Sequence, residues 1–368
     1  MPVYHLSGAL RGSKLHEVWI ADGIICYTQP ESLPASGIEE IRGYIYPGLL
    51  DAHTHPGVSR TAEPVSDADV LERLAACRSL GVTAIRDCGG QRNPNDVFTK
   101  DVSPQGYPKV LHCGQHIARY KRYIRYMPID VEPSQLPEEA ARQAQASDGW
   151  IKIVGDWIDR SLGTQADLRP LWPREVLIDA VAAAHDNGAR VAVHSFARST
   201  IDDLLDASVD SIEHGTGMTP DHLLEARMRG ILIDPTVCQI SRFPEFAADA
   251  GSKYPVYRDT MLSMDAHRVE HIAMMVDVGV DFLMGSDTAP AHELRERGLP
   301  VELVTAVRNG IPPATVMAAA SFAGRSRLGF SNWEQGAPAD FVVYDNDPER
   351  DISAVLKPTH VLIDGILV

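Results

Sequence analysis

The sequence predicts an α/β protein, a (β/α)8 TIM barrel with a small β-sandwich domain built from both chain termini. Short β-branched runs alternate with helical stretches through the middle of the chain, and both ends are rich in β-forming residues. A helix–Gly–strand junction also recurs, at Gly81, Gly188 and Gly279. Because parallel strands need crossover connections, which helices supply, this alternation favours a parallel barrel.

Composition is that of a globular protein with a large core. The chain has 368 residues, 44% hydrophobic and 23% charged. Its formal net charge of -16 argues against a nucleic-acid surface and against docking on anionic membranes. The five cysteines are scattered without a C-x-x-C, which is typical of reduced thiols. No segment resembles a signal peptide, and no apolar run approaches the ~20 residues that span a bilayer, so we expect a cytoplasmic protein.

The two ends of the chain are expected to form the smaller domain. Strands are predicted over residues 3–10, 18–28 and 38–45, with a turn signal at Asp22-Gly23. After residue 329 the β texture returns, at 336–345 and 358–368. We therefore expect residues 1–48 plus 330–368 to form the β-sandwich domain and residues 49–329 to form the barrel.

The middle of the chain supplies eight strand candidates and the helices between them. The strands are predicted at 46–53, 82–87, 109–114, 150–154, 190–194, 211–214, 231–236 and 281–287. The helices are predicted at 66–80, 135–147, 173–187, 200–207, 220–229, 257–278 and 299–309. A doubly wound open sheet is the alternative, but no G-x-G-x-x-G follows the first strand.

Polar residues of one chemical type stand at the ends of the barrel strands. Active sites of such barrels lie at the carboxyl ends of the strands. There the chain places six residues that can bind a metal: His53, His55, Lys152, His194, His214 and Asp287. Each alone has an ordinary structural explanation, such as a core histidine or a helix cap. All of them together, at the ends of one barrel, favour a metal site.

The chain resembles the amidohydrolase superfamily of metal-dependent hydrolases over nearly its whole length. The matching motifs are Pro47-Gly48-Leu49-Leu50-Asp51-Ala52-His53-Thr54-His55, Gly81-Val82-Thr83-Ala84-Ile85-Arg86-Asp87-Cys88-Gly89-Gly90, Ile151-Lys152-Ile153, His194, Ile212-Glu213-His214-Gly215, Gly285-Ser286-Asp287-Thr288 and Gly336-Ala337-Pro338-Ala339-Asp340-Phe341-Val342-Val343. The resemblance is closest to the imidazolonepropionase-like branch, which includes Xaa-Pro dipeptidases and carboxypeptidases.

The resemblance implies a binuclear metal centre. His53, His55 and Asp287 would hold the more buried ion, His194 and His214 would hold the second, and Lys152 would bridge the two as a CO2-derived carbamate. Desolvation inside a barrel favours the neutral amine that CO2 attacks. The ligand types suit two Zn ions, and Mn, Co, Ni or Fe are also compatible.

The implied reaction is hydrolysis of an amide or peptide-like C–N bond by a metal-bridging hydroxide, with Asp287 as general base and acid. A dipeptide or an N-acyl amino acid is the expected small-molecule substrate. Related mononuclear deaminases carry a Glu three residues after the strand-five His, where this chain has Ala197. The resemblance therefore argues against a deaminase and against imidazolonepropionase itself.

Two loops are expected to choose the substrate. The loop at 115–126 offers His116, Arg119, Tyr120 and Arg122 for a substrate carboxylate, although a solvated basic loop or an oligomer contact is an equal alternative. Asp156 and Trp157 follow the bridging Lys and could line the pocket mouth. The long loop at 238–255 could act as a lid.

Several alternatives stay open at this level. The same binuclear site could act on a lactone, a carbamate or urea, or a phosphotriester, or catalyse a decarboxylation, and a non-catalytic scaffold is a third reading. His267 and His271 stand four apart on a predicted helix, where we expect a surface pair. Ser195 beside His194 lacks the G-x-S-x-G elbow of serine hydrolases. The basic loop at 115–126 could also contact a second copy of the chain in a homo-oligomer.

Overall fold

The computed structural model describes residues 2–31, 37–59, 61–289 and 293–368. Its strands are β1 (Val3–Leu10), β2 (Glu17–Ala21), β3 (Ile24–Cys26), β4 (Ile38–Pro47), β5 (Leu49–Thr54), β6 (Val82–Asp87), β7 (Lys109–His112), β8 (Ile117–Arg119), β9 (Ile129–Val131), β10 (Trp150–Val154), β11 (Asp156–Ile158), β12 (Leu168–Pro170), β13 (Arg190–Ser195), β14 (Ser211–His214), β15 (Leu232–Asp234), β16 (Asp281–Phe282), β17 (Phe341–Tyr344), β18 (His360–Ile363) and β19 (Ile366–Leu367).

The helices lie between and after the barrel strands. They are α1 (Asp67–Ser79), α2 (Leu136–Ala146), α3 (Arg174–Asp186), α4 (Arg198–Ala207), α5 (Pro220–Arg229), α6 (Val237–Ile240), α7 (Phe243–Ala250), α8 (Pro255–Ala266), α9 (Arg268–Val278), α10 (Leu294–Arg297), α11 (Leu299–Arg308), α12 (Pro313–Ala319) and α13 (Phe322–Leu328). The described helices that follow the barrel strands are short. Among the described residues, every helix is too short or too polar to cross a bilayer.

The two chain ends build one seven-stranded sheet, in the order β19-β18-β17-β4-β1-β2-β3. The edge strand β3 contacts the segment just before β17, where the N–H of Ile25 donates to the carbonyl of Ala337. The sheet therefore curves back on itself. Its inner side chains, among them Leu6, Ile20 and Phe341, pack into one apolar core. The predicted sandwich is therefore a single curved sheet with a common core. Because this sheet has a core of its own, we propose that residues 1–48 plus 330–368 form a domain separate from the barrel.

The barrel strands are parallel, as predicted. The strands β5-β6-β7 form one run, and β16-β15-β14-β13-β10-β8-β9 form the other. The two ends of the barrel meet where Thr54 bridges Thr288 in parallel and where the N–H of Ala52 donates to the carbonyl of Met284. Apolar side chains such as Leu50, Ala192 and Leu283 fill the inside below these strand ends. The predicted (β/α)8 fold is confirmed.

Three predicted elements differ from the structure. The single helix expected at 257–278 is two helices, α8 and α9, which meet at His267 with ψ near 8°. The expected long loop at 238–255 is mostly helical. Pro244 and Pro255 each occupy the first turn of a helix, where the backbone N–H has no partner within the helix, so a proline costs no hydrogen bond there. The eighth strand also ends at Phe282, five residues earlier than expected.

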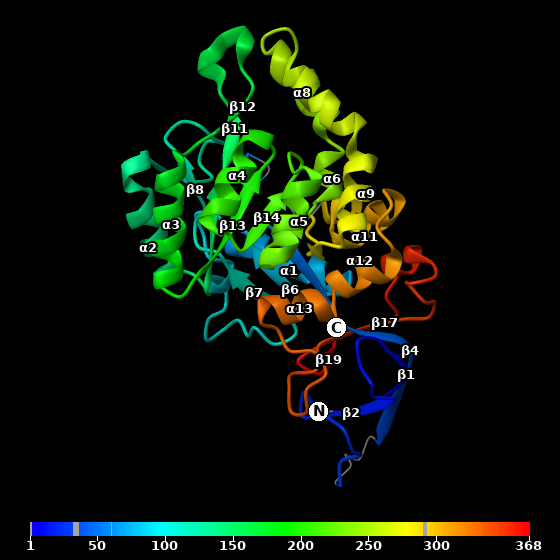
Figure 1. Ribbon diagram of the computed structural model, residues 1–368. Helices are drawn as coiled ribbons and strands as arrows, with labels where there is room; N and C mark the ends of the chain where they lie inside the picture. The colour runs from blue at the N-terminus through cyan, green and yellow to red at the C-terminus, as the bar shows by residue number, and fades with distance from the viewer. Residues whose placement is uncertain (1, 32–36, 60, 290–292) are drawn as a thin grey trace.

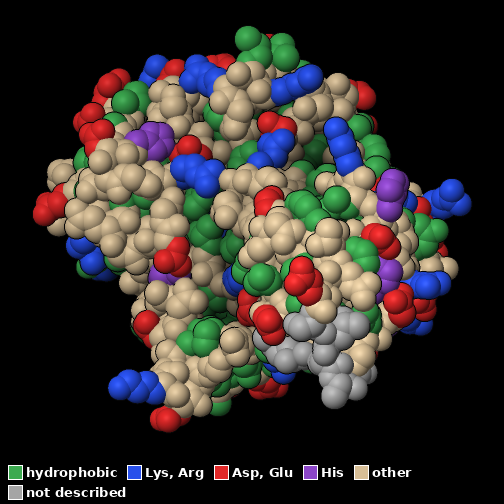
Figure 2. Space-filling view, turned by 90° about the horizontal axis from the view of Figure 1, so that it is seen from below, with side chains coloured by type: hydrophobic (Ala, Val, Ile, Leu, Met, Phe, Trp, Pro, Cys, Tyr) green, Lys and Arg blue, Asp and Glu red, His purple; other side chains and the backbone are tan. Residues whose placement is uncertain are grey.

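The terminal sheet and the strand-end loops lie at opposite ends of the molecule. In Figure 1 the sheet of β1, β2 and β4 lies at the bottom, whereas the β11–β12 hairpin and α8 project at the top. On the face seen from below, acidic and basic side chains are interspersed with apolar ones (Figure 2). Active sites of such barrels lie at the strand-end loops, so we expect the site at the top of Figure 1, where β11 and α8 flank the barrel mouth.

Candidate active site

A cavity of about 400 Å³ opens at the carboxyl ends of the barrel strands. All six residues predicted from the strand ends line it: His53, His55, Lys152, His194, His214 and Asp287. They come from β5, β10, β13, β14 and the segment after β16. The structure therefore brings together every candidate ligand that the sequence singled out.

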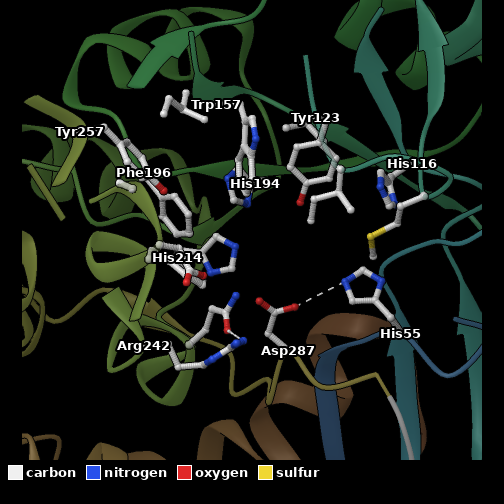
Figure 3. Close-up of a pocket in the computed structure, with 18 of the residues that line it drawn as sticks. His55, His116, Tyr123, Trp157, His194, Phe196, His214, Arg242, Tyr257 and Asp287 are labelled. Carbon is white, nitrogen blue, oxygen red and sulfur yellow. Dashed lines mark hydrogen bonds and ion pairs between the residues drawn. The ribbon is translucent and has the colours of Figure 1, made fainter. Parts of the chain in front are cut away.

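His53 lies at the end of β5 and His55 directly follows the strand, and both face Asp287. The Nε2 atoms of the two imidazoles each lie 3.5 Å from Oδ1 of Asp287, and Figure 3 shows the pairing with His55. The other ring nitrogen of His55, Nδ1, lies 2.8 Å from the carbonyl oxygen of Gly89. His55 is thereby oriented so that Nε2 points into the cavity.

The backbone at Asp287 is held in an unusual conformation. Its φ is 48°, in the left-handed region that side-chain-bearing residues rarely adopt. The hydroxyl of Ser286 donates to Asp51 over 2.6 Å, and the guanidinium of Arg73 donates to the carbonyl of Thr288 over 2.9 Å. These contacts on both sides fix the carboxylate toward the histidines, a placement of the kind found at functional sites.

His194, His214 and Lys152 line the same cavity. The two imidazoles lie with ring centroids 4.7 Å apart, and Nδ1 of His214 lies 2.6 Å from Oγ1 of Thr236. Nε2 of His194 and Nζ of Lys152 are buried and have no hydrogen-bond partner among the described residues. Buried polar atoms normally have partners, so these two mark the place of a missing one.

The imidazoles of the cavity favour the neutral state that binds metal. Burial lowers the pKa of His53 to about 4 and that of His214 to about 3, and it places the pKa of His194 well below its usual range. Burial alone would raise the pKa of Asp287, but the nearby imidazoles outweigh it and hold that pKa below its ordinary value. Neutral imidazoles beside a carboxylate are a donor set that fits divalent metal ions.

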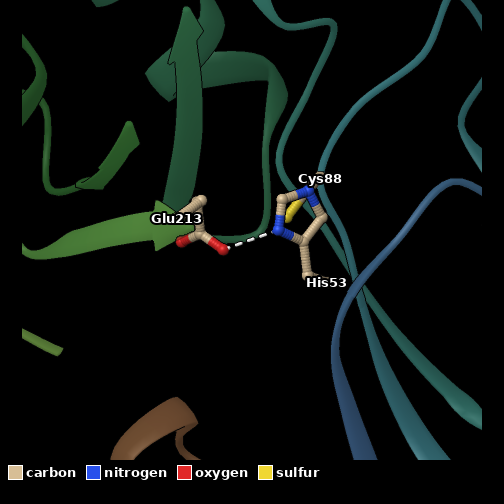
Figure 4. A group of neighbouring side chains, drawn as sticks. All are labelled: His53, Cys88 and Glu213. Carbon is tan, nitrogen blue, oxygen red and sulfur yellow. Dashed lines mark ion pairs between the residues drawn. The ribbon is translucent and has the colours of Figure 1, made fainter. Parts of the chain in front are cut away.

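A second group of possible metal ligands lies deeper, formed by His53, Cys88 and Glu213 (Figure 4). Burial raises the pKa of the Cys88 thiol well above its ordinary value, so the thiolate that binds metal is disfavoured. Oε2 of Glu213 lies 2.8 Å from Nδ1 of His53. These two atoms form a close buried pair, and neither has a hydrogen-bond partner among the described residues. Because the Cys88 thiolate is disfavoured, this group is a poorer donor set for a metal ion than the group at the cavity.

Of the four residues predicted to bind substrate, only His116 lines the cavity. It is 2% exposed, and neither ring nitrogen has a hydrogen-bond partner among the described residues. Arg119 donates toward the carbonyl of Leu171, Arg122 pairs with Asp159 at 3.2 Å, and Tyr120 is 49% exposed. None of these three side chains lines the cavity, so the arginine fork expected from this loop stays a prediction that the cavity lining does not support.

The cavity wall contains residues beyond the predicted metal ligands and substrate-binding residues. Arg160 after β11 and Arg242 before α7 bring positive charge, and aromatic side chains cover much of the remaining wall. These aromatic residues are Tyr123, Trp157, Phe196, Phe246, Tyr254 and Tyr257. Figure 3 shows Trp157 and Tyr257 on the side of the cavity away from Asp287. Their positions depend on the hairpin and on α7–α8, which had no clear sequence signal.

Trp157 lines the cavity as expected, whereas Asp156 does not. Asp156 is fully buried, accepts the hydroxyl of Ser195 over 2.7 Å and accepts the backbone N–H of Ala197 over 3.1 Å. It thereby holds the segment after His194. The hydroxyl of Ser195 is thereby engaged by Asp156, which agrees with the expectation that Ser195 is not a nucleophile.

The pair His267 and His271 is only partly a surface pair. His267 is exposed, with Nδ1 2.8 Å from the carbonyl of Ser263, whereas His271 is 9% exposed and its Nε2 lies 3.0 Å from the carbonyl of Gly215. The expectation that both are surface residues is wrong for His271, because the break at His267 turns α9 toward the loop that follows His214.

The barrel with its histidine-rich cavity at the strand ends has the architecture of a TIM-barrel enzyme. The model of the amidohydrolase family matches residues 44–368, and the chain belongs to this family. The protein is thus a hydrolase that acts on carbon–nitrogen bonds, in a family that generally uses divalent metal ions. The resemblance that the motifs indicated is confirmed.

The chain is also similar to several relatives and solved structures. An uncharacterized protein of Mycobacterium tuberculosis is 35% identical over 353 residues, covering 95% of this chain and 91% of the relative. An imidazolonepropionase of Solibacter usitatus is 23% identical, covering 84% and 78%. A Xaa-Pro dipeptidase structure with bound methionine has a TM-score of 0.78 at 20% identity, covering 100% and 99%. The A. niger ochratoxinase structure has a TM-score of 0.75 at 20% identity, covering 100% and 95%.

Proposed function

We propose that the protein hydrolyses the amide bond of a dipeptide or an N-acyl amino acid, using two divalent metal ions, with Zn as the first expectation. His53, His55 and Asp287 would hold one ion, His194 and His214 would hold the other, and Lys152 would bridge them as a carbamate. The observation that carries the proposal is the convergence of all six side chains on one cavity, with Nζ of Lys152 and Nε2 of His194 left without partners.

Carboxylation of Lys152 explains why a lysine stands among metal ligands. Lys152 is 4% exposed and lies beside β13, since it pairs with Ala192 in the parallel register. An ammonium at that depth without an acceptor would be strongly disfavoured. A carbamate would convert it into an anionic oxygen donor, which suits the centre of a ring of neutral imidazoles.

The protein's own groups divide the chemistry between them. When bound, the ions would acidify a water molecule and polarise the scissile carbonyl. Asp287 is placed to accept the proton of the attacking water and to return it to the leaving nitrogen. His116, neutral because burial lowers its pKa well below its usual range, can donate one ring N–H to a substrate oxygen.

The cavity wall supports a substrate with a carboxylate and a bulky apolar group. Arg160 and Arg242 are the two guanidinium groups among the described residues of the lining, and charge-assisted hydrogen bonds to a carboxylate are strong. The aromatic residues of the lining offer apolar surface, and Figure 3 shows Trp157 and Tyr257 on the side of the cavity away from Arg242. The Xaa-Pro dipeptidase structure has the same fold, and its name as a dipeptidase supports this choice of substrate class.

A panel assay tests the proposal. Metal-stripped protein is reconstituted with Zn or Mn and offered dipeptides, N-acyl amino acids, carbamates, ureas, lactones and phosphotriesters. We expect metal-dependent hydrolysis of amides that carry a carboxylate. Turnover of another class alone would replace the substrate assignment, and full activity of metal-free Lys152→Ala protein would overturn the metal mechanism.

Two accompanying expectations remain proposals. All five cysteines are free thiols, which supports action in the reducing cytoplasm. The expected homo-oligomer likewise stays a proposal, and Arg119 and Arg122 of the loop at 115–126, whose basic charge suggested it, lie outside the cavity lining.

A further inference from the structure

We propose that Asp249 is a specificity-determining residue that binds a cationic group of the substrate, so that the preferred substrate carries an ammonium group as well as a carboxylate. This role rests on the proposed function and deepens it, because it decides between the two substrate classes named there. A dipeptide with a free amino terminus has both charges near neutral pH, whereas an N-acyl amino acid has only the carboxylate.

Helix α7 turns one of its faces to the cavity. Arg242 at its N-cap lines the cavity, and so do Phe246, Asp249 and Ala250. Steps of three and four residues place side chains on one side of a helix, so these residues form a continuous face. Arg242 and Asp249 are about two turns apart, roughly 10 Å along the helix axis. A cation and an anion therefore stand at the two ends of this face.

Arg242 is held in place with part of its guanidinium still open. Its Nε donates to Glu245 over 3.0 Å and its Nη1 donates to Gln239 over 3.2 Å, while the guanidinium lies 5.3 Å from the ring centre of Phe246. Its Nη2 makes no hydrogen bond with the residues that the structure describes. This end of the face can therefore receive the substrate carboxylate.

Asp249 offers the opposite charge at the other end. In the described lining of the cavity it is the only carboxylate besides the candidate ligand Asp287. Its side chain is exposed, and within the described part of the chain it forms no ion pair and no side-chain hydrogen bond. Lys253 is the lysine nearest to it in the sequence, but the Nζ of Lys253 lies 5.1 Å from the ring centre of Tyr254. The carboxylate of Asp249 is thus available to a ligand.

A solvated surface carboxylate is the competing explanation, and the helix dipole argues for the binding role. Asp249 stands in the last turn of α7, where a basic residue would be favoured, and Arg242 stands at the N-terminal end, where an acidic one would be. Both charges have the less favourable sign for the helix, yet both line the cavity. An extended dipeptide spans about 7 Å, and the long side chain of Arg242 can cover the remaining distance.

The experiment compares the best dipeptide of the substrate panel with its N-acetyl derivative, by release of the C-terminal amino acid from metal-reconstituted protein. We expect wild-type protein to have the higher kcat/KM for the free dipeptide. Asp249→Asn should lower kcat/KM for the free dipeptide roughly tenfold, between the effect of an exposed ion pair and that of a buried charged hydrogen bond. It should leave kcat/KM for the N-acetyl derivative unchanged.

Two further variants serve as controls. Asp259 on α8 is also an exposed carboxylate, but it pairs with Arg258 at 2.8 Å and does not line the cavity. Asp259→Asn should leave kcat/KM for both substrates within about twofold of wild type. Asp249→Glu keeps the charge and should keep the preference for the free dipeptide.

The outcomes separate this role of Asp249 from the proposed function. If wild-type protein hydrolyses no amide of the panel, the proposed function fails and the role of Asp249 fails with it. If wild type hydrolyses amides but favours the N-acetyl derivative, the role of Asp249 is refuted and the proposed function stands. The same conclusion follows if Asp249→Asn lowers kcat/KM for both substrates equally, or for neither.

Discussion

The backbone N–H of Asp287 donates a 2.8 Å hydrogen bond to the carbonyl oxygen of His53. The last candidate ligand in the sequence is thereby attached to the first, across the seam where the barrel closes. Because the two residues share this bond, any shift of the segment after β16 moves the carboxylate relative to both histidines of β5. The seam is therefore part of the site as well as of the fold.

Replacing Arg73 should damage catalysis from outside the cavity. Its guanidinium donates to the carbonyl and the hydroxyl of Thr288, over 2.9 and 2.8 Å, and it is 1% exposed on α1. Arg73→Met would release the backbone next to Asp287, so we expect kcat to fall about tenfold or more with little change in KM. Steady-state kinetics on the best substrate of the panel measure both.

Arg78 on the same helix provides the control for that change. Its guanidinium also donates to a backbone carbonyl, that of Gly106, over 2.8 Å, but on the side of the barrel away from Asp287. Arg78→Met should leave kcat within about twofold of wild type. Equal losses of kcat in the two variants would show that Arg73 acts only through general stability.

Replacing Arg242 should weaken recognition of a substrate carboxylate. Arg242 lines the cavity and pairs with the exposed Glu245 at 3.0 Å, whereas Arg122 pairs with Asp159 outside the cavity. A charge-assisted hydrogen bond contributes about 1.5–3 kcal/mol, which corresponds to roughly 10–100-fold in KM. We expect Arg242→Met to raise KM for a carboxylate substrate by that factor and to change little for the same substrate with its carboxylate amidated.

Arg122→Met serves as the comparison, since the sequence alone would have chosen Arg122 as the carboxylate receptor. It should leave KM for both substrates near the wild-type values. The reverse result, with Arg122→Met selective and Arg242→Met without effect, would restore the loop at 115–126 as the recognition element.

Stability should depend on pH through His5 of the terminal sheet. Burial lowers the pKa of His5, but hydrogen bonds with Glu40 and Glu17, at 2.9 Å each, outweigh burial and raise it. A raised folded pKa means that the stabilisation is complete below the unfolded pKa of about 6.5 and is lost as the pH rises through the folded value. His5→Gln should therefore lower Tm more at pH 6 than at pH 8.5.

Thermal unfolding at the two pH values measures this difference, with His16→Gln as the control at an exposed histidine of the same sheet region. The control should lower Tm by the same small amount at both values. A His5→Gln effect that is equal at pH 6 and pH 8.5 would contradict the ion-pair interpretation.

The sequence predicted the barrel and the six candidate ligands because both depend on local patterns. Each ligand stands at the end of a short apolar strand, and parallel strands necessarily bring such ends to one side. The strand over 211–214 and the helix over 220–229 match the structure in both bounds. The N-cap at Ser66 likewise begins α1 where the pattern placed it.

The cavity wall could not be predicted in the same way. Arg160 and Arg242 reach the cavity only because the β11–β12 hairpin packs on α8, where the N–H of Tyr257 donates to the carbonyl of Ala166. That contact joins segments about ninety residues apart, with no periodic signal in either. The basic loop at 115–126 gave a stronger sequence signal, but its direction is set by tertiary contacts such as Arg122 with Asp159.

The most direct test of the account is the metal content of reconstituted protein, measured by elemental analysis after gel filtration. Wild-type protein supplied with bicarbonate and Zn should retain about two ions per chain, as a binuclear site requires. Lys152→Ala protein should retain one or none and should lose hydrolytic activity, because the bridging ligand is gone. Wild-type protein that retains no metal, or Lys152→Ala protein with full metal content and full activity, would contradict the account.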